Sequence, residues 1–162
     1  MPKTYEQLKD KERCIYQAFT KLSYVSDTAS NMGRHANTAG FDADDSRAVL
    51  CLANHYGLDQ CEVMHGSDIE SGEAGFDKGK EFIVIITRNH NTQSTVQRVS
   101  TGKGLVRGSE ARRVLESSPQ SVMWHAIYGR TDPISGSMIW LDDQKIEKNG
   151  PVGDCCAVVL YR

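Results

Sequence analysis

Apolar residues recur along the chain with two periods, which predict helices in the first third and mainly strands in the rest. A helical repeat follows the capping-box pair Thr4 and Gln7 and predicts a helix over residues 4–22. A second helical repeat, preceded by aspartates and ended by a glycine, predicts a helix over residues 43–56. Between them, residues 23–40 are rich in Ser, Asn, Thr and Gly, so we expect a loop there.

The remainder of the chain carries short apolar runs bounded by turn residues, the pattern of strands. Residues 82–86 (Phe-Ile-Val-Ile-Ile) are apolar on both faces and predict a central strand buried on two sides. Residues 132–136 predict a turn, and residues 109–115 a short helix. The other strands are expected at residues 61–64, 95–99, 122–127, 138–141 and 156–161.

This order of elements mixes hairpin turns with helical connections and shows no repeat or linker. We therefore predict an α+β fold: one mixed, mainly antiparallel sheet of about six strands with about three helices packed on it. At 162 residues the chain has the length of one domain, so residues 1–162 are assigned to a single domain.

Composition and charge narrow the function classes. A net charge of -2 argues against binding nucleic acid over the whole surface. The first residues are charged, which predicts no signal peptide, and no apolar run is long enough to cross a bilayer. Five cysteines, odd in number and without Cys-x-x-Cys spacing, predict reduced thiols, no metal site and a cytoplasmic location.

The segment of residues 98–113 concentrates positive charge and glycine directly before a predicted helix. A flexible glycine loop and the free N–H groups of a helix start suit a phosphate or carboxylate, although the spacing is not that of a P-loop. We expect a nucleotide or cyclic nucleotide held by basic side chains, with an aromatic ring stacked on the base and no cofactor. The alternative is a solvated loop followed by a capped helix. The candidate binding residues are Arg98, Thr101, Lys103, Gly104, Arg107, Ser109, Arg112 and Trp124.

Two His-x-[Ser/Thr] triplets, at residues 65–67 and 90–92, offer a catalytic interpretation. Phosphoesterases of the two-histidine type use one histidine as base and one as acid, while the hydroxyls bind phosphate. Here Asp68 and Gln93 stand where that family has an apolar residue, so we favour polar turns and a protein that is not an enzyme. The catalytic candidates under the phosphoesterase alternative are His65, Ser67, His90 and Thr92.

Other reactive side chains have structural explanations. The aspartates Asp42, Asp44 and Asp45 superficially have the D-x-D form of phosphatases, but no apolar strand precedes them, so we expect charges at a helix start. The cysteines fall in apolar surroundings and are expected to be buried. His125, in a predicted strand, is expected in the core.

The order of elements between residues 45 and 128 carries a resemblance. A helix ends in a glycine at residue 57, a strand leads to a glycine at residue 66, a charged residue precedes the apolar strand, and a Gln-x-Val-x-Trp strand follows at residues 120–124. This order, over about half the chain, resembles small uncharacterised α/β accessory proteins of phages. The resemblance implies a viral accessory or anti-defence protein that sequesters a nucleotide signal or, alternatively, inhibits a host enzyme by binding it.

Overall fold

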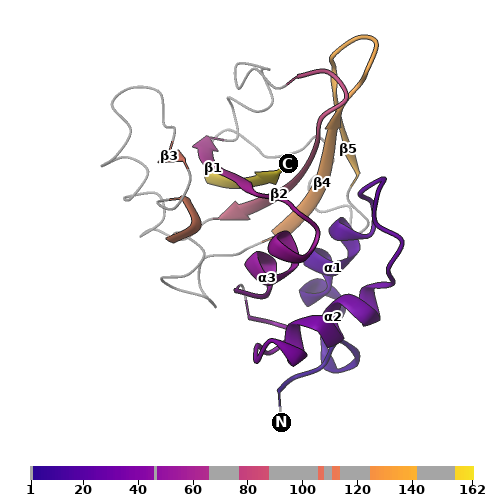
Figure 1. Cartoon of the computed structure of the whole chain (residues 1–162), viewed down its shortest axis with the longest axis vertical. Helices are drawn as coiled ribbons and strands as arrows, with labels where there is room; N and C mark the ends of the chain where they lie inside the picture. The colour runs from indigo at the N-terminus through magenta and orange to yellow at the C-terminus, as the bar shows by residue number, and fades with distance from the viewer. Residues whose placement is uncertain are drawn as a thin grey trace.

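The computed structural model has the α+β architecture that the sequence predicts. A six-stranded sheet carries helices on one face (Figure 1). Within the described part of the chain, no helix combines the length and apolar character needed to cross a bilayer. The structure describes residues 2–45, 47–65, 77–87, 106–107, 111–113, 125–141 and 156–162.

The strands follow the order β3-β1-β6-β2-β4-β5, and every pair among them is antiparallel. Their bounds are β1 Gln60–His65, β2 Glu81–Thr87, β3 Val106–Arg107, β4 His125–Thr131, β5 Met138–Leu141 and β6 Cys156–Tyr161. Four predicted strands are confirmed. The predicted strand 122–127 corresponds to β4, which runs further, and residues 122–124 and 95–99 lie outside the described residues.

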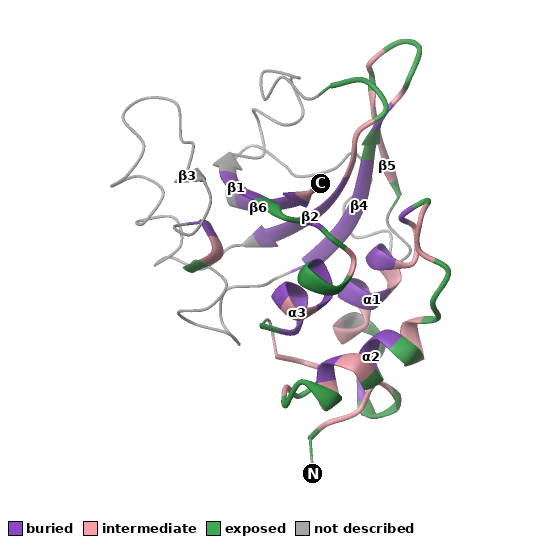
Figure 2. Cartoon of the chain, viewed as in Figure 1, coloured by how far each residue is buried: buried purple, intermediate pink, exposed green. Residues whose placement is uncertain are grey.

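Strand β2 is central in the sheet, between β6 and β4, and it is buried on both faces, as its sequence predicts. Ile83 and Ile85 join the core under the helices, whereas Phe82, Val84 and Ile86 join a second apolar cluster on the opposite face. All five side chains are fully buried (Figure 2). Burial of each such side chain contributes about 1.5–3 kcal/mol, so this strand stabilises both apolar clusters.

The predicted helix over residues 4–22 is wrong as one continuous element. The structure has the single-turn helices η1 (Tyr5–Gln7) and η2 (Asp10–Glu12), followed by α1 (Cys14–Phe19). The Thr4 N–H donates to Gln7 Oε1 at 2.9 Å, but Leu8 then adopts an extended conformation and ends the turn. Leu8 and the apolar residues of α1 are nevertheless buried. The spacing of apolar residues therefore predicted correctly which side chains are buried, but not that they lie on one continuous helix.

The predicted loop over residues 23–40 is also wrong, because helix α2 (Ala29–Thr38) lies there. Thr28 caps it by accepting the Asn31 N–H at 3.1 Å. Gly33 allows a close approach, since a Cβ atom there would lie 2.6 Å from the Tyr5 Cβ atom. A polar helix that buries little beyond Met32, Gly33 and Ala36 resembles a loop in its composition.

Helix α3 (Arg47–His55) begins four residues later than predicted. Asp45 caps it by accepting the Arg47 N–H at 2.9 Å, and Gly57 follows its end with a φ of 76°. The predicted role of the acidic residues at a helix start is confirmed for Asp45. Of the predicted helix 109–115, residues 111–113 are described and are helical.

Candidate functional site

Most residues singled out from the sequence lie outside the described part of the chain. The backbone of His65 ends β1 opposite Cys156, and the backbone of Arg107 pairs with Glu62. The basic segment and the two-histidine pair therefore stay predictions. The candidates outside the described residues are Ser67, His90, Thr92, Arg98, Thr101, Lys103, Gly104, Ser109 and Trp124.

Arg112 is the one ligand candidate whose side chain is described. Its guanidinium donates to the main-chain oxygen of Asp59 at 3.2 Å and, more weakly, to Asn54 Oδ1 at 3.5 Å. These contacts tie the helical turn of residues 111–113 to the end of α3. A ligand reaching Arg112 would meet a guanidinium that is already held in place.

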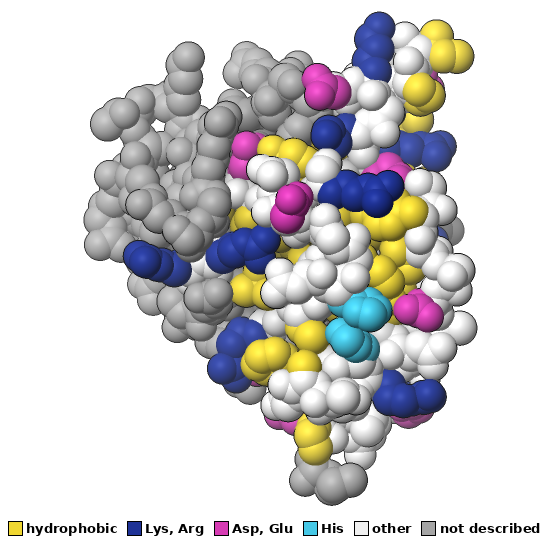
Figure 3. All heavy atoms as spheres, viewed as in Figure 1, with side chains coloured by type: hydrophobic (Ala, Val, Ile, Leu, Met, Phe, Trp, Pro, Cys, Tyr) yellow, Lys and Arg dark blue, Asp and Glu magenta, His cyan; other side chains and the backbone are white. Residues whose placement is uncertain are grey.

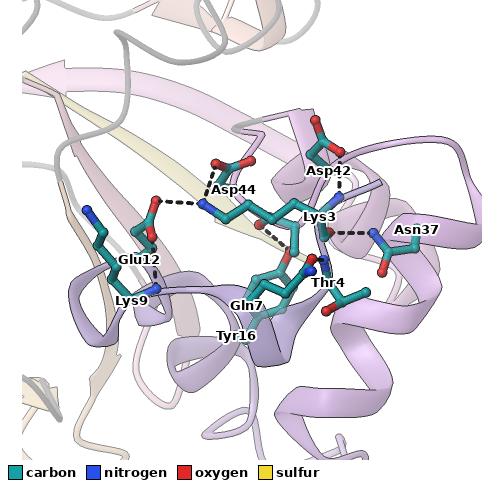
Figure 4. A network of polar contacts seen from close by, with 10 residues as sticks. Lys3, Thr4, Gln7, Lys9, Glu12, Tyr16, Asn37, Asp42 and Asp44 are labelled. Carbon is teal, nitrogen blue, oxygen red and sulfur yellow. Dashed lines mark hydrogen bonds and ion pairs between the residues drawn. The ribbon is translucent and has the colours of Figure 1, made fainter. Parts of the chain in front are cut away.

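The acidic residues before α3 hold the start of the chain (Figure 4). The Lys3 main-chain N–H donates to Asp42 Oδ1 at 2.7 Å, and Lys3 Nζ lies 3.2 Å from Asp44 Oδ2 and 3.7 Å from Glu12 Oε2. The Lys3 main-chain oxygen accepts from Asn37 at 2.8 Å. The carboxylates thus have structural partners, which favours the structural interpretation of the D-x-D sequence.

The described cysteines are unsuited to nucleophilic catalysis. Cys14, Cys51 and Cys61 are free thiols; Cys14 and Cys61 are buried as expected, whereas Cys51 is only partly buried. Burial raises the pKa of Cys61 to about 12 and, for Cys51, raises the pKa above its ordinary value. No group of three or more metal-ligating side chains occurs within the described ranges. His125 is only 1% exposed in β4, which confirms its expected core position.

A hollow of about 360 Å³ lies where β2 begins beside the end of β6. Because these two strands are antiparallel, with Ile83 opposite Leu160, the turn before β2 meets the residue after β6. The connection between α1 and α2 forms the third side. We call this hollow the Tyr24 pocket; its lining residues are Tyr24, Asp77, Lys78, Gly79, Lys80, Glu81 and Arg162. In the view of Figure 3, Lys and Arg side chains, interspersed with Asp and Glu, lie on the part of the surface near the β4–β5 hairpin.

The two lysines of the Tyr24 pocket donate to main-chain oxygens. Lys78 Nζ donates to the Ile134 main-chain oxygen at 3.3 Å, and Lys80 Nζ donates to the Arg162 main-chain oxygen at 3.1 Å. Lys80 Nζ also lies 5.4 Å from the centre of the Tyr161 ring. Neither lysine forms an ion pair with an Asp or Glu side chain among the described residues. Both ammonium groups can therefore still contact an anion that enters the pocket.

Arg162 and Tyr24 form a stacked layer in the same pocket. The guanidinium carbon of Arg162 lies 3.6 Å from the centre of the Tyr24 ring, a cation–π contact. Arg162 is exposed, so the guanidinium face turned away from the ring is open to a ligand. The Tyr24 hydroxyl is buried with no hydrogen-bond partner in the described part of the chain, a cost of about 1–3 kcal/mol.

Glu81 fixes the wall of the Tyr24 pocket. Its carboxylate accepts the Ser23 N–H at 3.0 Å, the Ser23 hydroxyl at 2.6 Å and the Tyr128 hydroxyl at 2.5 Å. Partial burial alone would raise the pKa of Glu81, but the hydrogen bonds from Ser23 and Tyr128, together with the nearby charge of Arg130, outweigh it and hold that pKa below its ordinary value. Glu81 thus stays charged and ties the α1–α2 connection to the sheet.

Asp77 differs from Glu81 because its carboxylate has no partner among the described residues. Its main-chain oxygen accepts the Thr131 hydroxyl at 2.6 Å, which positions the residue beside the pocket. Its side chain is exposed and makes no hydrogen bond or ion pair within the described ranges. The pocket therefore presents three cationic side chains that form no ion pair with an Asp or Glu side chain in the described part of the chain, one available carboxylate and a flat cation–aromatic layer.

Comparisons with protein families, with curated proteins and with solved structures find no match for this chain.

The sequence did not predict the Tyr24 pocket, because its residues come from three distant segments. The one local signal was Lys78-Gly79-Lys80-Glu81, a charged run directly before the apolar strand β2. Such a run is also typical of an exposed turn.

Proposed function

We propose that this protein is a non-enzymatic binding protein for a small anionic ligand, with a nucleotide or cyclic nucleotide as the favoured class. The observation that carries the proposal is the group of three cationic side chains around the Tyr24 pocket, none of them paired with an Asp or Glu side chain in the described part of the chain. A volume of about 360 Å³ lies within the range of small-molecule sites, roughly 300–1,000 Å³.

Electrostatics favour an anion at this position. A phosphate charge 4 Å from a cation gains about 1 kcal/mol in water and about 4 kcal/mol near a protein surface. Three cations at one pocket therefore make binding dependent on charge, and added salt weakens it. The flat Tyr24–Arg162 layer adds a surface on which a base can stack.

The experiment is a calorimetric titration of mononucleotides into the wild-type protein and into a Lys78→Ala/Lys80→Ala variant. We expect the double variant to bind at least about tenfold more weakly, since it loses two charge-assisted contacts. Lys9→Ala is the matched control, because Lys9 is exposed and lies outside the pocket. Equal affinity of the wild type and the double variant would contradict the assignment of the pocket.

The basic segment of residues 98–113 remains the alternative location for the same function. A Lys103→Ala/Arg107→Ala variant tests it in the same titration. Loss of binding in this variant, with binding intact in the Lys78→Ala/Lys80→Ala variant, would move the site to that segment.

We further propose that the protein acts in the cytoplasm as a viral accessory protein that sequesters a nucleotide signal. The free thiols of Cys14, Cys51 and Cys61 support a reducing compartment. The viral role rests on the resemblance in the order of elements. Native mass spectrometry of the protein purified from its host tests both the ligand and the alternative of a host protein partner: a retained nucleotide supports sequestration, and a retained stoichiometric protein supports inhibition.

A further inference from the structure

The carboxylates of the Tyr24 pocket restrict which anion it can accept. Glu81 is occupied, because three donors from Ser23 and Tyr128 surround its oxygens. Asp77 has no such partners within the described ranges, and it lines the pocket, so its negative charge acts on any ligand that enters. A ligand that is anionic throughout would be repelled by Asp77, so a suitable ligand carries N–H donors as well as an anionic group.

Among nucleotides, this requirement distinguishes the bases. Guanine presents N1–H and the 2-amino group side by side, and the two donors match the two oxygens of one carboxylate, as a guanidinium does. Adenine presents its amino group beside the N1 lone pair, and that lone pair would face the carboxylate unfavourably. The free carboxylate of Asp77 therefore favours guanine.

The flat layer next to Asp77 suits the same ligand. Arg162 lies on the Tyr24 ring at 3.6 Å and is itself exposed, so a purine can stack on its outer face. Lys78 and Lys80 line the same pocket and form no ion pair with an Asp or Glu side chain among the described residues, so they can hold a phosphate. A nucleotide uses all three features, whereas a free amino acid would leave the stacking surface uncovered.

We propose, on the basis of the proposed function above, that the Tyr24 pocket selects a guanine nucleotide. The base stacks on Arg162, its N1–H and 2-amino groups donate to the Asp77 carboxylate, and the phosphate binds the lysines. Selectivity for guanine thus resides in Asp77, and affinity for phosphate resides in Lys78 and Lys80.

The test is a calorimetric comparison of GMP, IMP and AMP, and of 3′,5′-cyclic GMP and cyclic AMP, at one ionic strength. We expect GMP to bind about ten- to a hundredfold more tightly than AMP, because two hydrogen bonds to a charged acceptor are at stake. IMP, which keeps N1–H but lacks the 2-amino group, should fall between them. Guanosine, which lacks the phosphate, should bind more weakly than GMP.

Asp77→Asn assigns the selectivity to its residue. We expect this variant to narrow the ratio of GMP to AMP affinity toward one, while Asp10→Asn, a control outside the pocket, keeps the wild-type ratio. Equal binding of GMP and AMP by the wild type, or an unchanged ratio in Asp77→Asn, would overturn the guanine assignment and leave the proposed function standing. No binding of any of these ligands would overturn both.

Discussion

Replacing Glu81 should destabilise the whole fold, because this carboxylate joins the α1–α2 connection to strands β2 and β4. Three hydrogen bonds of 2.5–3.0 Å converge on it from Ser23 and from the buried Tyr128 hydroxyl. A hydrogen bond to a charged group contributes about 1.5–3 kcal/mol, and partial exposure reduces the sum, so we expect Glu81→Ala to lose about 3–5 kcal/mol. Tyr128→Phe, which removes one donor, should lose about 1–2 kcal/mol.

The assay is urea unfolding at pH 7, followed by circular dichroism, for the wild type, both single variants and the double variant. The double variant should be more stable than the sum of the single losses implies, with a coupling of about 1–2 kcal/mol between Glu81 and Tyr128. If Glu81→Ala lost less than about 1 kcal/mol of unfolding free energy, or if Glu81 and Tyr128 showed no coupling, Glu81 would not be the residue that connects the α1–α2 segment to the sheet.

Glu81 also makes the stability of the fold depend on pH, and this stability falls as the pH is lowered. The folded-state pKa of Glu81 is held below its unfolded value, so its stabilisation is present above the ordinary glutamate pKa of about 4.3. That stabilisation is lost as the pH falls through the lower folded pKa. Below that pH the difference in unfolding free energy between wild type and Glu81→Gln should therefore shrink; a constant difference would contradict the linkage.

Three further outcomes are expected. Gly129→Ala places a Cβ atom 2.5 Å from the Trp140 ring and should cost about 1–3 kcal/mol in urea unfolding, and no loss would show that the ring moves freely. Tyr16→Phe removes the buried 2.6 Å hydrogen bond to the Ala43 carbonyl and should lower the free energy of unfolding by about 1–3 kcal/mol, and an unchanged midpoint would contradict this. Cys61, whose buried thiol has a pKa of about 12, should react with a thiol reagent at pH 8 only as fast as the protein opens; fast labelling of the native state would be inconsistent with its burial.

The sheet was predictable because the strands that become buried are short runs of apolar residues bounded by turn residues. Strand β2 has apolar side chains on both faces, and both faces are buried. The β4–β5 turn was predictable from Asp132, whose Oδ1 accepts the N–H groups of Ile134 and Ser135 at 2.8 and 2.9 Å, and from Gly136 with its φ of 75°.

Helix α2 was not predictable because its sequence is polar and its stability depends on contacts made elsewhere. Gly33 is a weak helix former, but its lack of a side chain lets Tyr5 of η1 pack closely against α2. Thr28 caps the start of the helix. The break after Leu8 was likewise hidden, since a capping pair closes a single turn as readily as it starts a long helix.

The Tyr24 pocket could not be found from local patterns. Tyr24, Lys80 and Arg162 meet only because β6 pairs with β2 rather than with a neighbour in sequence. Strand order is set by long-range packing, and spacing along the chain does not encode it. The free carboxylate of Asp77 is likewise a property of the folded neighbourhood.

The most direct test of the central claim is a titration of GMP into isotope-labelled protein, followed by amide NMR shifts. We expect the largest shifts at Tyr24, Lys80, Glu81 and Arg162, on either side of the Tyr24 pocket. The same shifts should be reduced in the Lys78→Ala/Lys80→Ala variant. Shifts confined to residues outside this pocket, or no shifts at millimolar nucleotide, would contradict nucleotide binding in the Tyr24 pocket.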